Sequence, residues 1–148
     1  AWWTNTAASR WMLRAVIDTN VVVSALNFGG KPQKVLELAR AGKILNITSP
    51  FILGEIQGVL VRKFWWQLAT AKETVNDIQK FSYLVFPPEE IAAIDYPPDN
   101  RILECAVAGQ ATYIISGDHH LTSLKTFQDI KIVDPAAFLA IITGAGGR

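Results

Sequence analysis

The chain has almost no cysteine and no long apolar run. Cys105 is the only cysteine among 148 residues, so no internal disulfide can form and no cysteine–histidine cluster indicates structural zinc. We expect Cys105 to be a small buried core residue rather than a nucleophile. No apolar stretch reaches the roughly 18 residues of a membrane-spanning helix, since Arg14 and Asp18 interrupt the best candidate. These absences predict a protein without a membrane span in the reducing cytoplasm.

Charge is scarce as well. Charged residues make up 18% of the chain and the net charge is +1, whereas a typical domain has roughly 25% charged residues. This composition excludes a disordered chain, and it permits a nucleic-acid partner without requiring one. Half of the residues are hydrophobic, which is enough for a substantial core in a single domain.

Methionine occurs once, at Met12. Residues 1–11 lack the apolar centre of a signal peptide, so we expect them to be an added or upstream extension outside the domain. Residues 143–148 are rich in glycine and are expected to be a flexible tail. The predicted domain therefore covers residues 12–142.

Short β-branched runs alternate with helical patterns along this domain. The runs predict strands at 13–17, 44–48, 84–86, 113–116 and 130–133. The apolar spacing predicts helices at 20–26, 32–41, 50–64, 70–83, 99–108 and 135–142. Ser49 before Pro50 is typical of a helix start, and Thr70 with Glu73 forms a capping-box pattern. The alternation predicts an α/β fold, with three α/β/α layers around a five-stranded parallel sheet.

Four acids stand where different segments break off. Asp18 ends the first strand, Glu55 lies inside the helix that starts near Pro50, Asp99 opens a helix, and Asp118 follows the fourth strand. A buried carboxylate is costly unless it is paired or bound to a cation. Ligands of open α/β sheets bind beyond the carboxyl ends of the strands, where Asp18 and Asp118 stand. Four converging acids predict a site for a hard metal ion.

Each acid also has an ordinary explanation. Asp18 and Asp99 suit the N-cap position of a helix, and Asp118 after a glycine suits a turn. Glu55 fits the solvated edge of an amphipathic helix. The residue pattern alone leaves both explanations open for every one of the four.

Neighbouring polar residues are weaker candidates. Asn20 either caps a helix or supports a site, and Ser116 either ends its strand or hydrogen-bonds a carboxylate or phosphate. Glu104 lies five residues after the third acid, about 140° around the helix, which favours a surface or supporting role. The histidines at 119–120 would need further ligands to form a zinc site.

The pattern from Met12 to about Ile142 resembles the PIN-domain family of metal-dependent ribonucleases. The likeness is greatest to the VapC-like toxins of bacterial and archaeal toxin–antitoxin pairs. Its four motifs appear here in order, at residues 16–21, 49–55, 99–106 and 113–118. Many relatives carry another acid two residues beyond the fourth aspartate, and here His120 takes its place. This departure weakens the expectation of a full second metal site.

The resemblance implies cleavage of RNA phosphodiester bonds with Mg²⁺ or Mn²⁺ as cofactor. It implies four catalytic, metal-binding acids with three supporting polar residues: Asp18, Glu55, Asp99 and Asp118, supported by Thr19, Asn20 and Ser116. Glu55 is the acid expected to bind metal through a water or to orient the nucleophile. The resemblance also implies a cognate antitoxin and a homodimer. Residues 64–66 (Phe-Trp-Trp) either join that interface or pack in the core.

Two other functions fit parts of the pattern. A small-molecule phosphatase would use Asp18 as a nucleophile, but the haloacid-dehalogenase-like pattern needs a second acid where Asn20 stands. A non-catalytic module that binds RNA or protein would not need the intact quartet of acids. A metal-dependent ribonuclease accounts for all four acids together, and it is the function that we predict.

Overall fold

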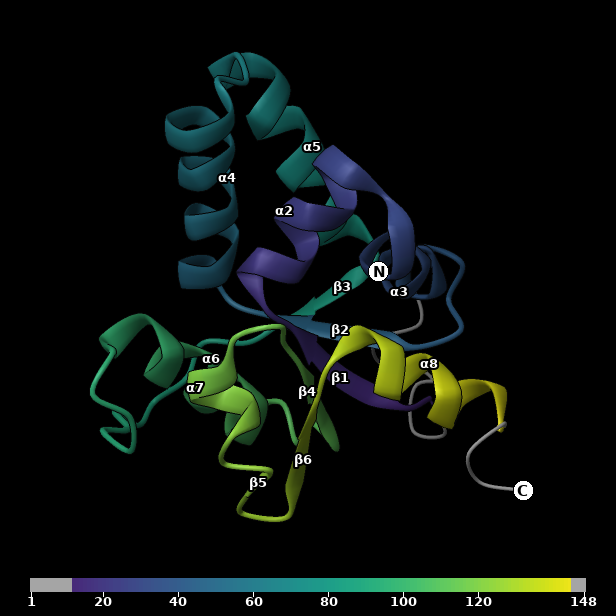
Figure 1. Cartoon of the computed structure of the whole chain (residues 1–148). Helices are drawn as coiled ribbons and strands as arrows, with labels where there is room; N and C mark the ends of the chain where they lie inside the picture. The colour runs from purple at the N-terminus through teal and green to yellow at the C-terminus, as the bar shows by residue number, and fades with distance from the viewer. Residues whose placement is uncertain (1–11, 145–148) are drawn as a thin grey trace.

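The computed structural model describes residues 12–144 and shows one mixed sheet with helices on both faces (Figure 1). The strand order is β3-β2-β1-β4-β6-β5, in which every pairing is parallel except that of β5 with β6. The strands are β1 (Arg14–Ile17), β2 (Leu45–Thr48), β3 (Ser82–Leu84), β4 (Tyr113–Ile115), β5 (Thr126–Phe127) and β6 (Ile130–Val133). The predicted α/β class and its five parallel strands are confirmed, and β5 is an additional antiparallel edge strand. The predicted extension and most of the predicted tail lie outside the described residues.

The helices form two layers around the sheet. They are α2 (Thr19–Phe28), α3 (Gly30–Arg40), α4 (Pro50–Phe64), α5 (Leu68–Lys80), α6 (Pro97–Ala108), α7 (His119–Thr122) and α8 (Pro135–Thr143). Figure 1 shows α2 to α5 on one side of the sheet and α6 and α7 on the other, while α8 packs against α3. Between residues 12 and 144, no helix has both the length and the apolarity to cross a bilayer.

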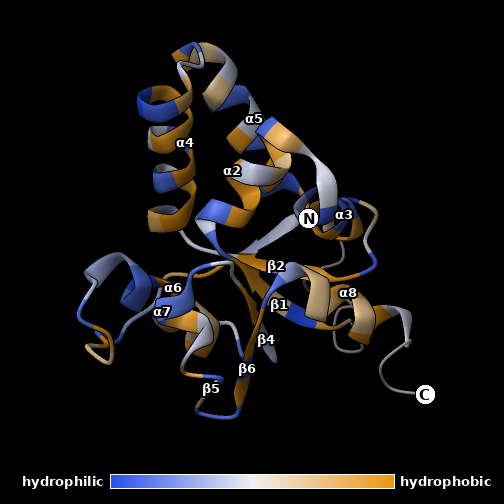
Figure 2. Cartoon of the chain, in the orientation of Figure 1, coloured by the Kyte–Doolittle hydropathy of each residue, from blue (hydrophilic) through white to orange (hydrophobic). Residues whose placement is uncertain are grey.

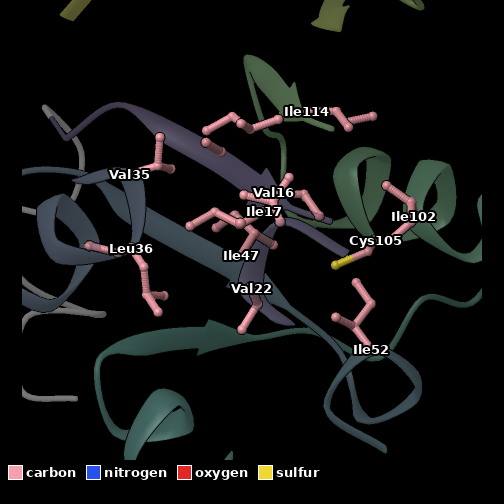
Figure 3. Close-up of a cluster of buried hydrophobic side chains, with 14 of the residues drawn as sticks. Val16, Ile17, Val22, Val35, Leu36, Ile47, Ile52, Ile102, Cys105 and Ile114 are labelled. Atoms are coloured by element: carbon pink, nitrogen blue, oxygen red, sulfur yellow. The ribbon is translucent and has the colours of Figure 1, made fainter. Parts of the chain in front are cut away.

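The core surrounds β1, whose residues from Ala15 onward are buried on both faces of the sheet. Figure 2 shows hydrophobic colouring along the central strands β1, β4 and β6, as expected for a parallel sheet covered on both sides. Figure 3 shows Val16 and Ile17 between side chains of α3 and side chains of α6. Cys105 lies in this core, where burial raises the pKa of its thiol to about 12. The thiol therefore stays protonated, which fits the expected core role and not that of a nucleophile.

The segment between α4 and β3 differs from the prediction. Trp65 adopts a left-handed conformation (φ 55°) that ends α4, and α5 starts at Leu68 with Gln67 at its N-cap. The predicted capping box was therefore wrong, because Thr70 already lies within the helix. Strand β3 also starts two residues early. Ser82 donates to Ile78 O and accepts from Asn46, which ends the helix and fixes Ser82 in the sheet.

Helix α6 begins at Pro97 and not at the predicted Asp99. Proline suits the first helical position because its fixed φ is helical and its missing N–H would be unpaired there anyway. At the other end, a Cβ at Gly109 would lie 2.2 Å from Ile47 Cγ2. Only glycine therefore lets α6 end so close to β2. This close packing fixes the position of α6, and with it Asp99, against the sheet.

The chain changes direction across the sheet between β1 and β4. From β1 it runs outward through β2 to β3 with α2 to α5 on one face, and α6 then carries it back on the other face to β4. The carboxyl ends of β1 and β4 therefore leave a crevice at a topological switch point, the usual position for a ligand in such sheets. The backbone N–H of Asp18 donates to Ile115 O at 2.9 Å, which ties the two strand ends together at this crevice.

Candidate active site

Asp18 directly follows β1 and is only 4% exposed. It occupies the N-cap position of α2, but its side chain makes no capping hydrogen bond. Its Oδ2 instead accepts a hydrogen bond of 2.7 Å from Ser116 Oγ. The cap explanation of this carboxylate is therefore not supported, because the side chain turns toward the end of β4.

Ser116 connects the first and fourth acids. It is fully buried, and its hydroxyl both donates to Asp18 and accepts from the backbone N–H of Asp118 at 3.0 Å. Asp118 in turn accepts a hydrogen bond from His120 N at 2.9 Å and so caps the short helix α7. Asp118 therefore has a local structural role, as the cap of α7, and its charge also acts on Asp18.

Glu55 is held at the site by α2. The hydroxyl of Thr19, itself 3% exposed, donates to Glu55 Oε1 at 2.7 Å. The Glu55 side chain is partly buried, so it is not a freely solvated residue on the helix edge. Thr19 therefore fixes one oxygen of the Glu55 carboxylate. Asn20 is exposed and lines a cavity beside Asp118.

Asp99 is buried at the third residue of α6, with 5% of its surface exposed. Its Oδ2 is one of two buried polar side-chain atoms in the described residues that have no hydrogen-bond partner. Burial first, and then the neighbouring negative charges of Asp118 and Asp18, raise the pKa of Asp99 to about 7. Without a cation, Asp99 therefore holds a proton next to Asp118 across part of the physiological range.

The pKa values of Asp18 and Asp118 shift in opposite directions. Burial raises the pKa of Asp18 to about 6, with Asp118 and Glu55 adding to the rise and Ser116 opposing it. Burial alone would raise the pKa of Asp118 too, but hydrogen bonds from the backbone and side chain of His120 oppose it, and that pKa is lowered. The structure thus brings the four predicted acids into one electrostatic group.

The donor atoms of this group suit a hard divalent cation, although no three of the four acids have ligand oxygens within 4.8 Å of one another. Its donors are carboxylate oxygens, which Mg²⁺ and Mn²⁺ prefer, and Asp99 Oδ2 lacks the partner that a buried carboxylate oxygen needs. Burial and the neighbouring carboxylates raise the pKa values of Asp18 and Asp99, so a cation in the crevice would favour the charged forms of both. A bound cation would supply both the partner and the charge.

The two histidines after Asp118 have their ring nitrogens close to its carboxylate. Ligand atoms of Asp118, His119 and His120 all lie within 4.8 Å of one another, which no other group of three such residues achieves within residues 12–144. His120 Nδ1 lies 3.0 Å from Asp118 Oδ1, and the two imidazole rings lie 4.2 Å apart. Both histidines are exposed. This group therefore adjoins the quartet and shares Asp118 with it.

Sequence reasoning missed a clamp on the loop before α6. The Asn100 side chain accepts from the N–H groups of Ala93 and Ile94 and donates to Ile94 O. Glu104 accepts from Ile91 N and pairs with Arg101. Glu104 therefore supports the loop and not the quartet. The available signal was the presence of two polar residues, Asn100 and Glu104, in a helix whose other residues after Asp99 are mostly apolar.

A cavity of about 730 Å³ opens next to Asp118. It is lined at the starts of α2, α3 and α8 by residues that include Asn20, Ser24, Lys31 and Asp134. Lys31 is exposed at the second residue of α3 and is the only basic residue in this lining. The cavity offers room for part of a substrate, with the positively charged side chain of Lys31 in the same lining as Asp118.

Ser116→Ala is expected to weaken divalent metal binding by about 10- to 100-fold, the usual cost of losing a residue that orients a metal ligand. The substitution frees the Asp18 carboxylate and leaves the N–H of Asp118 without its partner. Calorimetric titration with Mn²⁺ measures the effect. Ser123→Ala, at an exposed position on the far end of α7, is the matched control. Equal affinities in the two variants would show that Ser116 only ends its strand.

Comparison with known proteins bears on this site. The family model described as PIN domain matches residues 14–120, a span that includes all four acids. The uncharacterized protein MJ1680 of Methanocaldococcus jannaschii is 34% identical over 118 residues, covering 76% of this chain and 76% of that protein. The family match therefore covers β1 to β4, the helices that carry Glu55 and Asp99, and the crevice between β1 and β4.

Proposed function

The chain belongs to the PIN domain family, and on that premise we propose that it is a ribonuclease that depends on Mg²⁺ or Mn²⁺. PIN domains are generally metal-dependent nucleases. The observation that carries the proposal is Asp99 Oδ2, a buried carboxylate oxygen without a partner beside Asp18 and Asp118. A protein that only binds RNA has no need to hold acids in this costly arrangement.

Each residue of the site has a part in this mechanism. Asp18, Asp99 and Asp118 would hold the ion, which when bound acidifies a water and stabilises charge on the leaving oxygen. Ser116 fixes the carboxylate of Asp18, and Thr19 fixes that of Glu55. Glu55 is partly exposed, so it can orient the nucleophile from α4.

The cavity beside Asp118 is the place for the RNA backbone next to the cut. Lys31 contributes the positive charge for a phosphate, and the polar side chains of Asn20 and Ser24 lie in the same lining. This assignment suits the near-neutral net charge of the chain, because phosphate contact is limited to one part of the surface.

Incubation of the purified protein with unstructured RNA tests the proposal. We expect cleavage in Mg²⁺ or Mn²⁺ and none in EDTA, with RNA ends that are the same in both metals. Intact RNA in both metals, together with tight RNA binding, would favour a non-catalytic module. A phospho-aspartate trapped at Asp18 would favour a phosphatase.

We further propose that the ribonuclease is the toxin of a toxin–antitoxin pair, acts in the cytoplasm where its RNA is, and forms a homodimer. Trp65 supports an interface because it is 86% exposed at the end of α4. Phe64 is half-buried and packs against Phe28. Trp66 is also half-buried and donates a hydrogen bond to Asn27. Both contacts favour packing within the chain.

Arrested growth on induced expression tests the toxin role, and the arrest should be lost in an Asp18→Asn variant. Sedimentation of a Trp65→Ser variant tests the dimer.

A further inference from the structure

Two exposed aromatic rings lie at the same sheet edge as the acids. Phe51 is the second residue of α4, directly after β2, and Phe86 stands two residues beyond β3. They are 45% and 72% exposed. Both line a cavity of about 250 Å³, together with Ser49, Pro50, Pro87, Arg101 and Glu104. Exposed phenylalanine is unfavourable in water, so two such residues around one cavity indicate a surface that a ligand covers.

The charges in this cavity favour an uncharged ligand group. Arg101 and Glu104 are paired with each other, and Glu104 also accepts from Ile91 N. The pair leaves no free cation for a phosphate. Exposed aromatic faces are the usual surroundings of an unpaired nucleobase.

The cavity lies close to the quartet along helix α4. Phe51 and Glu55 are four residues apart on α4, so they share one face and lie about one turn, ~5.4 Å, apart along the axis. A strand whose phosphate lies at the acids therefore brings a neighbouring base to Phe51 and Phe86.

We propose that Phe51 and Phe86 form a stacking subsite for an unpaired nucleobase beside the scissile phosphate. This inference rests on the proposed ribonuclease function and narrows its substrate to RNA that is single-stranded at the cut. A base inside a duplex has both faces covered by its neighbours, so it cannot also stack on the two rings. The subsite tolerates different bases, because every base presents an aromatic face.

Binding of a labelled single-stranded oligoadenylate tests the subsite. The protein carries Asp18→Asn and the buffer contains EDTA, so that no RNA is cut during fluorescence anisotropy. Phe51→Ala and Phe86→Ala are each expected to raise Kd by about 5- to 100-fold, as lost base stacking does elsewhere. Phe86→Trp should keep the affinity, and Phe86→Leu should lose it, because leucine is apolar but has no aromatic face. A duplex of the same length should bind more weakly than the single strand.

Phe28→Ala is the matched control. Phe28 is 73% exposed, as Phe86 is, but it lies at the opposite end of α2 from Asp18, ~15 Å along the axis. Its removal should leave the affinity unchanged. Thermal melting of every variant establishes that the fold is intact.

The outcomes separate this inference from the proposed function. Unchanged Kd values for the two alanine variants, or equal affinity for duplex and single strand, overturn the subsite, while RNA cleavage by the wild-type protein leaves the ribonuclease proposal standing. A protein that neither cleaves nor binds RNA overturns both. Weaker binding in both alanine variants, with the tryptophan variant unaffected, supports the subsite.

Discussion

Asp18→Asn is expected to lower metal-dependent RNA cleavage by more than about 100-fold while the fold stays intact. Even residues that only support a metal ligand cost about 10- to 100-fold when they are mutated, and Asp18 stands at the centre of the acidic group. Asparagine keeps an oxygen for the hydrogen bond from Ser116. The substitution therefore removes the negative charge with little change in packing. Cleavage rates in Mn²⁺ and near-ultraviolet circular dichroism measure the two halves of this prediction.

Asp77→Asn is the control for the same chemical change. Asp77 lies on α5, with 53% of its side chain exposed, and makes only a surface ion pair with Lys80, so its loss should not affect cleavage. Asp118→Asn is expected to behave like Asp18→Asn, because asparagine is also a good N-cap and preserves the start of α7. Wild-type cleavage by either site variant would remove the quartet from the mechanism.

The same Asp18→Asn substitution is expected to stabilise the metal-free protein at neutral pH by up to about 3 kcal/mol. Burial, opposed by Ser116 and assisted by Asp118 and Glu55, raises the pKa of Asp18 from 3.8 to about 6. Between these two values the folded protein keeps a proton that the unfolded chain has lost. The free energy of unfolding therefore falls as the pH rises from about 4 to 6, and the whole penalty is present above that range. Asparagine carries no charge and avoids it.

Urea unfolding in EDTA at pH 4 and pH 8 measures this effect. The difference in unfolding free energy between variant and wild type should be small at pH 4 and largest at pH 8. Mn²⁺ at pH 8 should stabilise the wild type more than the variant, because a ligand of the folded state adds more stability the more tightly it binds. A wild type that equals or exceeds the variant in stability at pH 8 in EDTA would show that Asp18 is not strained by its surroundings.

The sequence is sufficient to locate half of the candidate site. Asp18 and Asp118 follow apolar strands, and in a parallel sheet the ends of strands meet at one edge, so their proximity follows from the pattern of residues. Glu55 and Asp99 lie within helices. Their distance from the sheet edge depends on how α4 and α6 pack, which the local pattern does not contain. The family resemblance supplied these two residues, and the structure places both beside Asp18.

The remaining differences share one physical cause, which is contact between distant parts of the chain. Asn46 holds Ser82 in the sheet across 36 residues and moves β3 away from its most apolar stretch. Gln128 and Asp129 adopt positive φ in a two-residue turn between β5 and β6. That turn is usually marked by Asn-Gly, so the hairpin left no strong local signal. The helix start at Pro97 was likewise hidden by the preference for aspartate as a cap.

The outermost strands of the sheet limit how the chain can assemble. The edge strand β3 has three residues, and β5, at the opposite edge, has two. Edges this short expose few unpaired backbone groups, and short edge strands are a common protection against strand-to-strand aggregation. A second copy of the chain, or a partner protein, would gain little by extending the sheet. Assembly of this protein is therefore expected to depend on side chains of its helices, and fibrillar association through the sheet edge is disfavoured.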